Sequence, residues 1–253
     1  MADKSLGQHW LFDKTALQAV VAAAEIRSGD TVLEIGPGLG SLTEELLNSG
    51  AEVKAVEFDR RLITDLRDKF FGQRLQVIET DILKYDLNNL PSGYKVCANI
   101  PYYLTGQILR RLTEAANRPK IAVLLVQKEV AEKVTTEPGE NSLLSIAMQL
   151  YADCHLGAVV PAELFSPPPK VDSRILIMKF YKQLQVENPE KFLRIVRAGF
   201  SSPRKKLRSS LSGGLGIAKA SAEKMLLAAE IDPDRRAQTL SLEEWRKLSL
   251  VDF

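Results

Sequence analysis

Two short segments of the chain combine residue types that can do chemistry together. Residues 34–40 read Glu-Ile-Gly-Pro-Gly-Leu-Gly and end one apolar run, and residues 99–103 read Asn-Ile-Pro-Tyr-Tyr and end another. The first is a glycine-rich turn of the kind that lets a nucleotide-like cofactor lie against the backbone. The second offers an amide acceptor, a rigid turn and an aromatic face at one point. Together they indicate methyl transfer to a planar amine.

Four candidate residues follow four successive strand-like runs. Gly36, Glu57, Asp81 and Asn99 are separated by 21, 24 and 18 residues, which is about one strand and one helix each time. In an open parallel sheet, the carboxyl ends of the strands share one edge, and ligands bind there. We therefore expect these four residues to lie close together.

Each of the first three positions has a binding role and a structural alternative. Gly36, Gly38 and Gly40 would let the backbone approach a cofactor, Glu57 can accept hydrogen bonds from both ribose hydroxyls, and Asp81 can accept one from an adenine amino group. The alternatives are a tight turn with close helix packing for the glycines, a strand-end cap for Glu57 and an Asx turn for Asp81. The glycines and Glu57 alone would also fit a nicotinamide oxidoreductase.

The segment 99–102 carries the more specific signal. The exocyclic amine of adenine is a poor nucleophile because its lone pair is delocalised into the ring. The side-chain carbonyl of Asn99 and the backbone carbonyl of Ile100 can accept its two hydrogens, Pro101 stiffens the turn, and Tyr102 can stack on the base. The alternative is a strand-ending proline turn with its tyrosines packed in the core, and a DNA amino-methyltransferase would more often carry Asp at position 99.

The hydrophobic pattern predicts an α/β fold with a mostly parallel sheet, covered by helices on both faces. Only helical periodicity remains near the carboxyl end, so we expect a catalytic domain over 1–182 and a small helical domain over 183–253. Strands are predicted at 31–35, 51–57, 75–79, 95–98, 121–126 and 174–181, and helices at 14–26, 41–50, 60–70, 106–116 and 142–151, with an exposed loop at 135–141.

The charge of the chain is unevenly distributed. Residues 1–169 carry 17 Lys and Arg against 22 Asp and Glu, a net −5, whereas residues 170–253 carry 17 against 10, a net +7. A basic carboxyl-terminal third favours a polyanion such as nucleic acid as partner, and a solvated helical surface is the milder alternative.

Composition excludes several other classes of protein. No apolar run has the length of a signal peptide core or a membrane span, so we expect a cytoplasmic protein without a membrane partner. Cys97 and Cys154 are too few and too far apart for a disulfide framework or a zinc site, and with only two histidines we expect no metal centre.

These motifs jointly resemble those of the rRNA adenine dimethyltransferase family. Residues 4–11 are similar to the amino-terminal motif of that family, which usually has Phe where Trp10 stands. Further similar motifs lie at 32–43, Glu57, Asp81, 99–105 and 165–173. The resemblance implies a Rossmann-like class I methyltransferase sheet and S-adenosylmethionine as methyl donor. The donor would be contacted through His9, Leu11, Gly36, Gly38, Gly40, Glu57, Asp81, Ile82 and Asn99.

The same resemblance implies a substrate. It points to dimethylation of two adjacent adenosines near the 3′ end of small-subunit rRNA, within an immature 30S particle and by a monomeric enzyme. Phe165 would face Tyr102 across the target base, although from the residues alone such a phenylalanine is more often a core aromatic.

The carboxyl-terminal third contains a basic motif at 199–211 that also resembles the family, apart from Pro203 and serines where the family often has Asn. Arg204, Lys205, Lys206 and Arg208 would contact RNA phosphates. Two rival functions remain open from the sequence: an adenine methyltransferase of large-subunit rRNA of the macrolide-resistance type, and a non-catalytic ribosome assembly factor that kept the fold.

Overall fold

The computed structural model describes residues 8–252, which divide into two compact units. The first unit contains residues up to 131 and residues 153–180, and the second contains residues 132–152 and those from 181 onwards.

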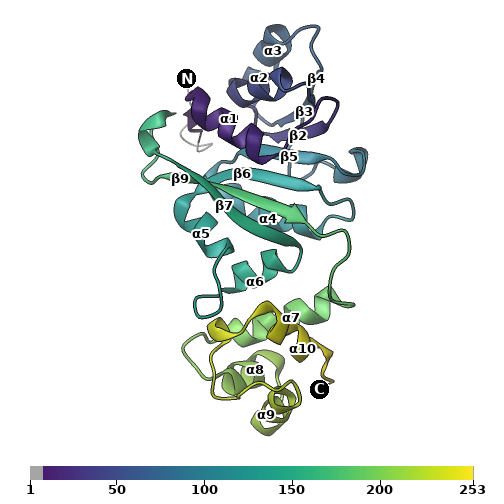
Figure 1. Ribbon diagram of the computed structural model, residues 1–253, viewed down its shortest axis with the longest axis vertical. Helices are drawn as coiled ribbons and strands as arrows, with labels where there is room; N and C mark the ends of the chain where they lie inside the picture. Colours follow the sequence, from purple (N-terminus) through teal and green to yellow (C-terminus); the bar gives the residue numbers. More distant parts are fainter. Residues whose placement is uncertain (1–7, 253) are drawn as a thin grey trace. The chain divides into compact units, whose positions relative to one another are not determined.

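A seven-stranded sheet in the described residues forms the framework of the first unit (Figure 1). Its strand order is β4-β3-β2-β5-β6-β9-β7. The strands are β2 (Thr31–Ile35), β3 (Glu52–Glu57), β4 (Leu75–Glu79), β5 (Lys95–Asn99), β6 (Ile121–Gln127), β7 (Ala152–Val160) and β9 (Ser173–Phe180). The pairs from β4 to β6 are parallel, and β9 pairs with β6 in the antiparallel direction. This confirms the predicted α/β fold with a mostly parallel sheet.

Local capping explains where two of the helices begin. Asp13 precedes α1 (Lys14–Ala23), and its Oδ1 accepts a hydrogen bond from the Ala16 amide at 2.8 Å. Asp59 precedes α3 (Arg60–Lys69) and accepts from the Arg61 amide in the same way. Such caps satisfy amide groups that the first helical turn leaves without partners. The other helical segments are α2 (Ser41–Asn48), α4 (Thr105–Glu114), α5 (Lys128–Val134), η2 (Leu87–Asn89), η3 (Tyr102–Leu104) and η4 (Ala162–Leu164).

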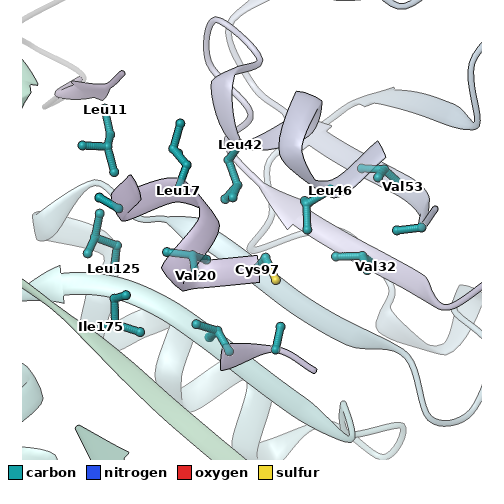
Figure 2. Packing of buried hydrophobic residues seen from close by; sticks show 14 of the residues in the cluster. Leu11, Leu17, Val20, Val32, Leu42, Leu46, Val53, Cys97, Leu125 and Ile175 are labelled. Atoms are coloured by element: carbon teal, nitrogen blue, oxygen red, sulfur yellow. The ribbon is translucent and has the colours of Figure 1, made fainter. Parts of the chain in front are cut away.

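A continuous apolar core joins α1 and α2 to one face of the sheet (Figure 2). Val20 of α1 and Leu46 of α2 pack in the same buried cluster as Val32, Cys97 and Leu125 of three neighbouring strands. Leu33 and Ile35 alternate with Val32 along β2 and are also buried, because consecutive side chains of a strand point to opposite faces. Both faces of the sheet are therefore covered, as expected for parallel strands.

A two-stranded antiparallel ribbon was not predicted. It consists of β1 (Trp10–Leu11) and β8 (Phe165–Ser166), with Leu11 opposite Phe165 and Trp10 opposite Ser166. This ribbon brings Trp10 and Leu11, at the end of the amino-terminal motif, next to the segment that precedes the prolines at 167–169, whereas residues 4–7 of that motif lie outside the described residues. Two motifs more than 150 residues apart in the sequence thus become neighbours.

The second unit is helical. Its elements are α6 (Leu143–Gln149), α7 (Pro189–Phe200), α8 (Leu207–Leu215), α9 (Lys219–Ala228), η5 (Ala237–Thr239) and α10 (Leu242–Leu250). Trp245 of α10 is fully buried and lies against Phe200 of α7, with 5.7 Å between ring centroids. Gly214 lets α8 approach α7, since a Cβ there would lie 2.5 Å from Cα of Ala198.

The segment 132–152 groups with the carboxyl-terminal helices, although the domains predicted from the sequence place it in the first. Its attachment is specific: the side chain of Asn141 is buried and donates to the carbonyl of Leu240 at 2.9 Å, and the Gly139 amide donates to the carbonyl of Gln238. Local sequence patterns cannot predict this grouping, because the hydrogen-bond partners lie about 100 residues away in the chain.

Candidate functional site

A cavity of about 340 Å³ opens at the carboxyl ends of the parallel strands, within the range typical of small-molecule sites. The turns after β2, β3, β4 and β5 all contribute to it, as the spacing of Gly36, Glu57, Asp81 and Asn99 predicts. Most of the predicted site residues line it: His9, Leu11, Gly36, Gly38, Glu57, Asp81, Ile82, Asn99, Ile100, Pro101 and Tyr102. Gly40 and Phe165 do not.

The glycine turn needs its glycines for two different reasons. Gly36 and Gly38 have φ angles of 66° and 58°, in the left-handed region that side chains disfavour, and both line the cavity. Gly40 has a φ of 81° and precedes α2, where a Cβ would lie 2.6 Å from the ring of Phe70. The structure thus gives Gly40 the packing role that the sequence left as an alternative, and its contact with a cofactor stays a prediction.

Glu57 is held by the backbone of two turns. Its Oε1 accepts from the amides of Phe58 and Asp59, both at 2.8 Å, and its Oε2 accepts from the amide of Gly38 at 3.2 Å. Burial raises the pKa of this carboxyl, and these three amides oppose that shift. Each carboxylate oxygen can accept more than one hydrogen bond. Glu57 is therefore a strand-end cap that also presents acceptor capacity to the cavity.

Asp81 likewise combines both expected roles. Its Oδ1 accepts from the Leu83 amide at 2.9 Å, which forms an Asx turn after β4. The residue also lines the cavity, together with the buried Ile82. A turn fixed in this way holds the carboxylate in place without a basic partner.

Glu34 is a cavity residue to which the sequence analysis assigned no role. Its side chain is only 1% exposed, and the hydroxyl of Thr43 donates to its Oε2 at 2.7 Å. Burial raises the pKa of the Glu34 carboxyl to about 8, and the nearby carboxylate of Glu57 adds to the shift. The sequence signal that could have identified Glu34 is its place at the start of the glycine motif, two residues before Gly36.

The side chain of Asn99 has a defined orientation. Its Nδ2 donates to the backbone carbonyl of His9 at 2.9 Å. The amide nitrogen is therefore occupied, and the side-chain carbonyl Oδ1 is the atom left to accept hydrogen bonds at the cavity. This is the orientation that acceptance of an amino hydrogen requires.

Tyr102 and His9 form an aromatic pair beside Asn99. The Tyr102 hydroxyl lies 2.8 Å from the Ser173 hydroxyl, and the Tyr102 and His9 rings are stacked with 5.8 Å between centroids. Nδ1 of His9 donates to the carbonyl of Pro167 at 2.7 Å, because a carbonyl can only accept. His9, in the described part of the amino-terminal motif, thus contacts both the turn at 99–102 and the proline segment.

Phe165 is a residue of the hydrophobic core. It is 4% exposed and packs in the same cluster as Leu11 and Val160. The ring recorded against Tyr102 is that of His9. The position of Phe165 opposite Tyr102 stays a prediction, and the described structure gives the residue the role of core aromatic.

The chemistry of the lining favours a cationic nucleoside as ligand. Glu57, Asp59 and Asp81 contribute carboxylates, Glu34 contributes a buried carboxyl group, and the described lining contains no lysine or arginine. The indole nitrogen of Trp10, next to Gly38, is buried and lacks a hydrogen-bond partner among the described residues. In the same part of the chain, no group of three or more His, Cys, Asp or Glu is arranged to hold a metal ion.

The basic segment 204–208 lies in the second unit, and its basic side chains differ in whether they form ion pairs. Lys206 and Arg208 form ion pairs with Asp234, at 2.6 and 2.9 Å, and Arg208 also lies 3.6 Å from Glu223. Arg204 and Lys205 are exposed and have no ion pair within the described residues. Two of the four predicted phosphate ligands are therefore partly neutralised within the protein.

Comparison with known proteins agrees with this geometry. The family model described as ribosomal RNA adenine dimethylase matches residues 1–248. The chain is 43% identical to the Ribosomal RNA small subunit methyltransferase A of Dehalococcoides mccartyi (strain CBDB1), over 98% of this chain and 88% of the relative. It is 42% identical to the protein of that name from Thermosynechococcus vestitus, over 99% of this chain and 96% of the relative.

Solved structures show the same fold. A dimethyladenosine transferase from Plasmodium falciparum aligns with a TM-score of 0.83 and 28% identity, covering 95% of this chain and 96% of that one. The 23S rRNA methyltransferase ErmE aligns with a TM-score of 0.79, also at 28% identity, covering 95% and 98%. The helices in the described residues are all too short or too polar to cross a membrane. The expected methyltransferase fold and family are thus confirmed, and this chain belongs to the ribosomal RNA adenine dimethylase family.

Proposed function

We propose that this protein transfers methyl groups from S-adenosylmethionine to the N6 atoms of two adjacent adenosines near the 3′ end of 16S rRNA, as a step of ribosome biogenesis. The observation that carries the proposal is the fixed orientation of Asn99, whose Nδ2 donates to the His9 carbonyl at 2.9 Å. Family membership supports the reaction class, and relatives above 40% identity that are named small subunit methyltransferases support the choice of subunit.

The residues of the cavity suit this cofactor. S-adenosylmethionine supplies a methyl group on a positively charged sulfonium. The carboxylates of Glu57 and Asp81, with the carboxyl group of Glu34 as a further acceptor, give the cavity a charge and acceptor set that fits a cation with ribose and adenine groups. Gly36 and Gly38 keep the turn free of side chains, so the backbone can approach the ligand.

The catalytic turn would act on the target amine. Asn99 Oδ1 and the Ile100 carbonyl accept the two N6 hydrogens, which favours a pyramidal nitrogen with a localised lone pair. Tyr102 stacks on the base, and its hydroxyl contact with Ser173 limits rotation of the ring. The bound cofactor would supply an electrophilic methyl group, which the N6 lone pair would take up as the C–S bond gives its electrons to sulfur, with an N6 proton lost to solvent. Positioning and electrostatics supply the rate, without a strong base.

The enzyme would act as a monomer in the cytoplasm, on an immature 30S particle, with Arg204, Lys205, Lys206 and Arg208 contributing phosphate contacts. Glu57 would bind ribose, Asp81 the adenine amino group, and Phe165 would reach the target base in the complex.

The test is transfer of labelled methyl groups to small ribosomal subunits that lack the modification. Large subunits serve as the control for the alternative that the enzyme methylates 23S rRNA. This control is needed because the 23S rRNA methyltransferase ErmE has a similar fold. Mass spectrometry should find dimethyladenosine at adjacent positions of the small-subunit RNA alone. Label in the large subunit would favour the rival methyltransferase, and cofactor binding without any transfer would favour an assembly factor.

A further inference from the structure

Tyr103 is an exposed aromatic residue at the edge of the cavity. Its side chain is 58% exposed, although it directly follows Tyr102 and lines the same cavity. It is not part of the buried core, and no stacked ring partner is recorded for it among the described residues. A tyrosine ring that is more than half exposed at the mouth of a site is suited to pack on a ligand.

The local backbone separates the two tyrosine side chains. Both lie in η3 (Tyr102–Leu104), whose turn is closed by the hydrogen bond from the Leu104 amide to the Pro101 carbonyl at 2.9 Å. In a 3₁₀ helix, successive side chains point about 120° apart. Tyr102 therefore reaches Ser173, while Tyr103 is turned toward solvent beside it.

The proposed substrate makes a particular demand on this surface. An adenosine whose base enters the cavity leaves its neighbour without a stacking partner. In this reaction that neighbour is itself the second target. Aromatic side chains bind unpaired bases by stacking, which stabilises each base by about 1–3 kcal/mol. Two tyrosines on consecutive residues would serve two consecutive nucleotides.

We propose that Tyr103 stacks on the base of the second adenosine while the first is held against Tyr102. Tyr103 is thus a positioning residue for the pair of targets. It holds the neighbouring base close to the cavity, where it is the next to be methylated. This inference rests on the proposed function, because it requires adjacent target adenosines.

The test compares Tyr103→Ala with Tyr103→Phe, which keeps the ring. Phe71→Ala is the matched control, since Phe71 is 91% exposed and lies outside the cavity lining. On small subunits lacking the modification, we expect Tyr103→Ala to raise KM about tenfold with kcat and the Kd for S-adenosylhomocysteine unchanged. Tyr103→Phe and Phe71→Ala should behave like wild type.

A second arm tests the contact itself. In particles where uridine replaces the neighbouring adenosine, the base offers a smaller face for stacking. In the presence of S-adenosylhomocysteine, the Kd of the wild-type enzyme for these particles should be several-fold higher than its Kd for the original particles. The Kd of Tyr103→Ala should hardly differ between the two kinds of particle. Equal sensitivity of the two enzymes, or an unchanged KM for Tyr103→Ala, would overturn the inference. Failure of the wild type to methylate any particle would instead overturn the proposed function.

Discussion

The cavity and the basic segment use charged and polar side chains in opposite ways. Around the cavity, Glu57 accepts from three backbone amides and Asn99 is oriented by a backbone carbonyl. In the basic segment, Lys206 and Arg208 are paired only with surface carboxylates. Backbone partners fix atoms in place, whereas surface ion pairs contribute little energy and rearrange easily.

This difference follows from what each region has to do. Transfer of a methyl group needs reacting atoms at defined positions, so its residues are held before the substrate arrives. Attraction of RNA phosphates needs positive charge near the surface and tolerates movement. We therefore expect single substitutions to have large effects at the cavity and small, additive effects in the basic segment.

The largest effect is expected at Asn99. Asn99→Ala removes an acceptor for the N6 hydrogens, and kcat should fall by about 10²- to 10³-fold, as for other lost transition-state hydrogen bonds. Single-turnover methylation of unmodified small subunits measures this. The Kd for S-adenosylhomocysteine is the control and should change much less. Activity within tenfold of wild type would show that the fixed amide has no catalytic role.

Asn99→Asp is the sharper variant at this position. Aspartate has the same size but cannot donate to the His9 carbonyl when ionised, so its oxygen would face another oxygen 2.9 Å away. We expect a loss of activity close to that of Asn99→Ala. Full activity of Asn99→Asp would contradict the orientation argument.

The pH dependence of the free energy of unfolding tests how strongly burial affects the Glu34 carboxyl. Its pKa lies at about 8 in the folded protein against an ordinary 4.5, so folding favours the protonated form. The associated stability is fully present below pH 4.5 and is lost as pH rises through 8. Glu34→Gln cannot ionise. Its free energy of unfolding should therefore rise relative to wild type across this window, with a limiting slope of about 1.4 kcal/mol per pH unit.

Urea unfolding of both proteins at pH 5, 7 and 9 measures the difference. Asp234→Asn is the matched comparison, because Lys206 lowers the pKa of the exposed Asp234 carboxyl. Any effect there has the opposite sign, since its stability is lost as pH falls, and it should weaken in high salt. Parallel pH profiles of wild type and Glu34→Gln would contradict the account of Glu34.

Two substitutions of Tyr102 distinguish the contribution of its aromatic ring to activity from that of its hydroxyl. Tyr102→Ala should lower kcat/KM about 10- to 100-fold, through loss of stacking on the target base. Tyr102→Phe loses only the contact with the Ser173 hydroxyl, so we expect a few-fold decrease. The two variants are compared by methylation of small subunits. Equal losses in both would assign the effect to the hydroxyl.

The smallest effects are expected within the basic segment. Neutralising Arg204 and Lys205 together should weaken particle binding more than neutralising Lys206 and Arg208, because Asp234 already offsets part of the latter charge. Each lost phosphate contact should reduce the slope of log K against log salt by about 0.7. Titration at several salt concentrations gives both quantities. An unchanged slope in both double variants would place the segment outside the RNA interface.

Elements with strong local signals were predictable from the sequence. The branched apolar run of β2 was predicted at its observed bounds, Thr31–Ile35, and so was β4 at Leu75–Glu79. β7 (Ala152–Val160) was missed because it contains Gly157 and has no regular alternation of buried residues. A larger residue would not fit at position 157, because a Cβ there would lie 2.9 Å from Cβ of Ile175 in β9. That contact is invisible in a local window.

Residue types and their spacing were enough to predict which side chains meet at the site. Residue types such as Gly36, Glu57, Asp81 and Asn99, one at each expected strand end, predict a shared edge because parallel strands all point the same way. The contacts that hold these groups in place come from the folded chain. Folding placed the His9 carbonyl against Asn99, Ser173 against Tyr102 and Phe165 in the core. These contacts join residues 71 to 154 positions apart, where side-chain packing, and no local propensity, selects the partner.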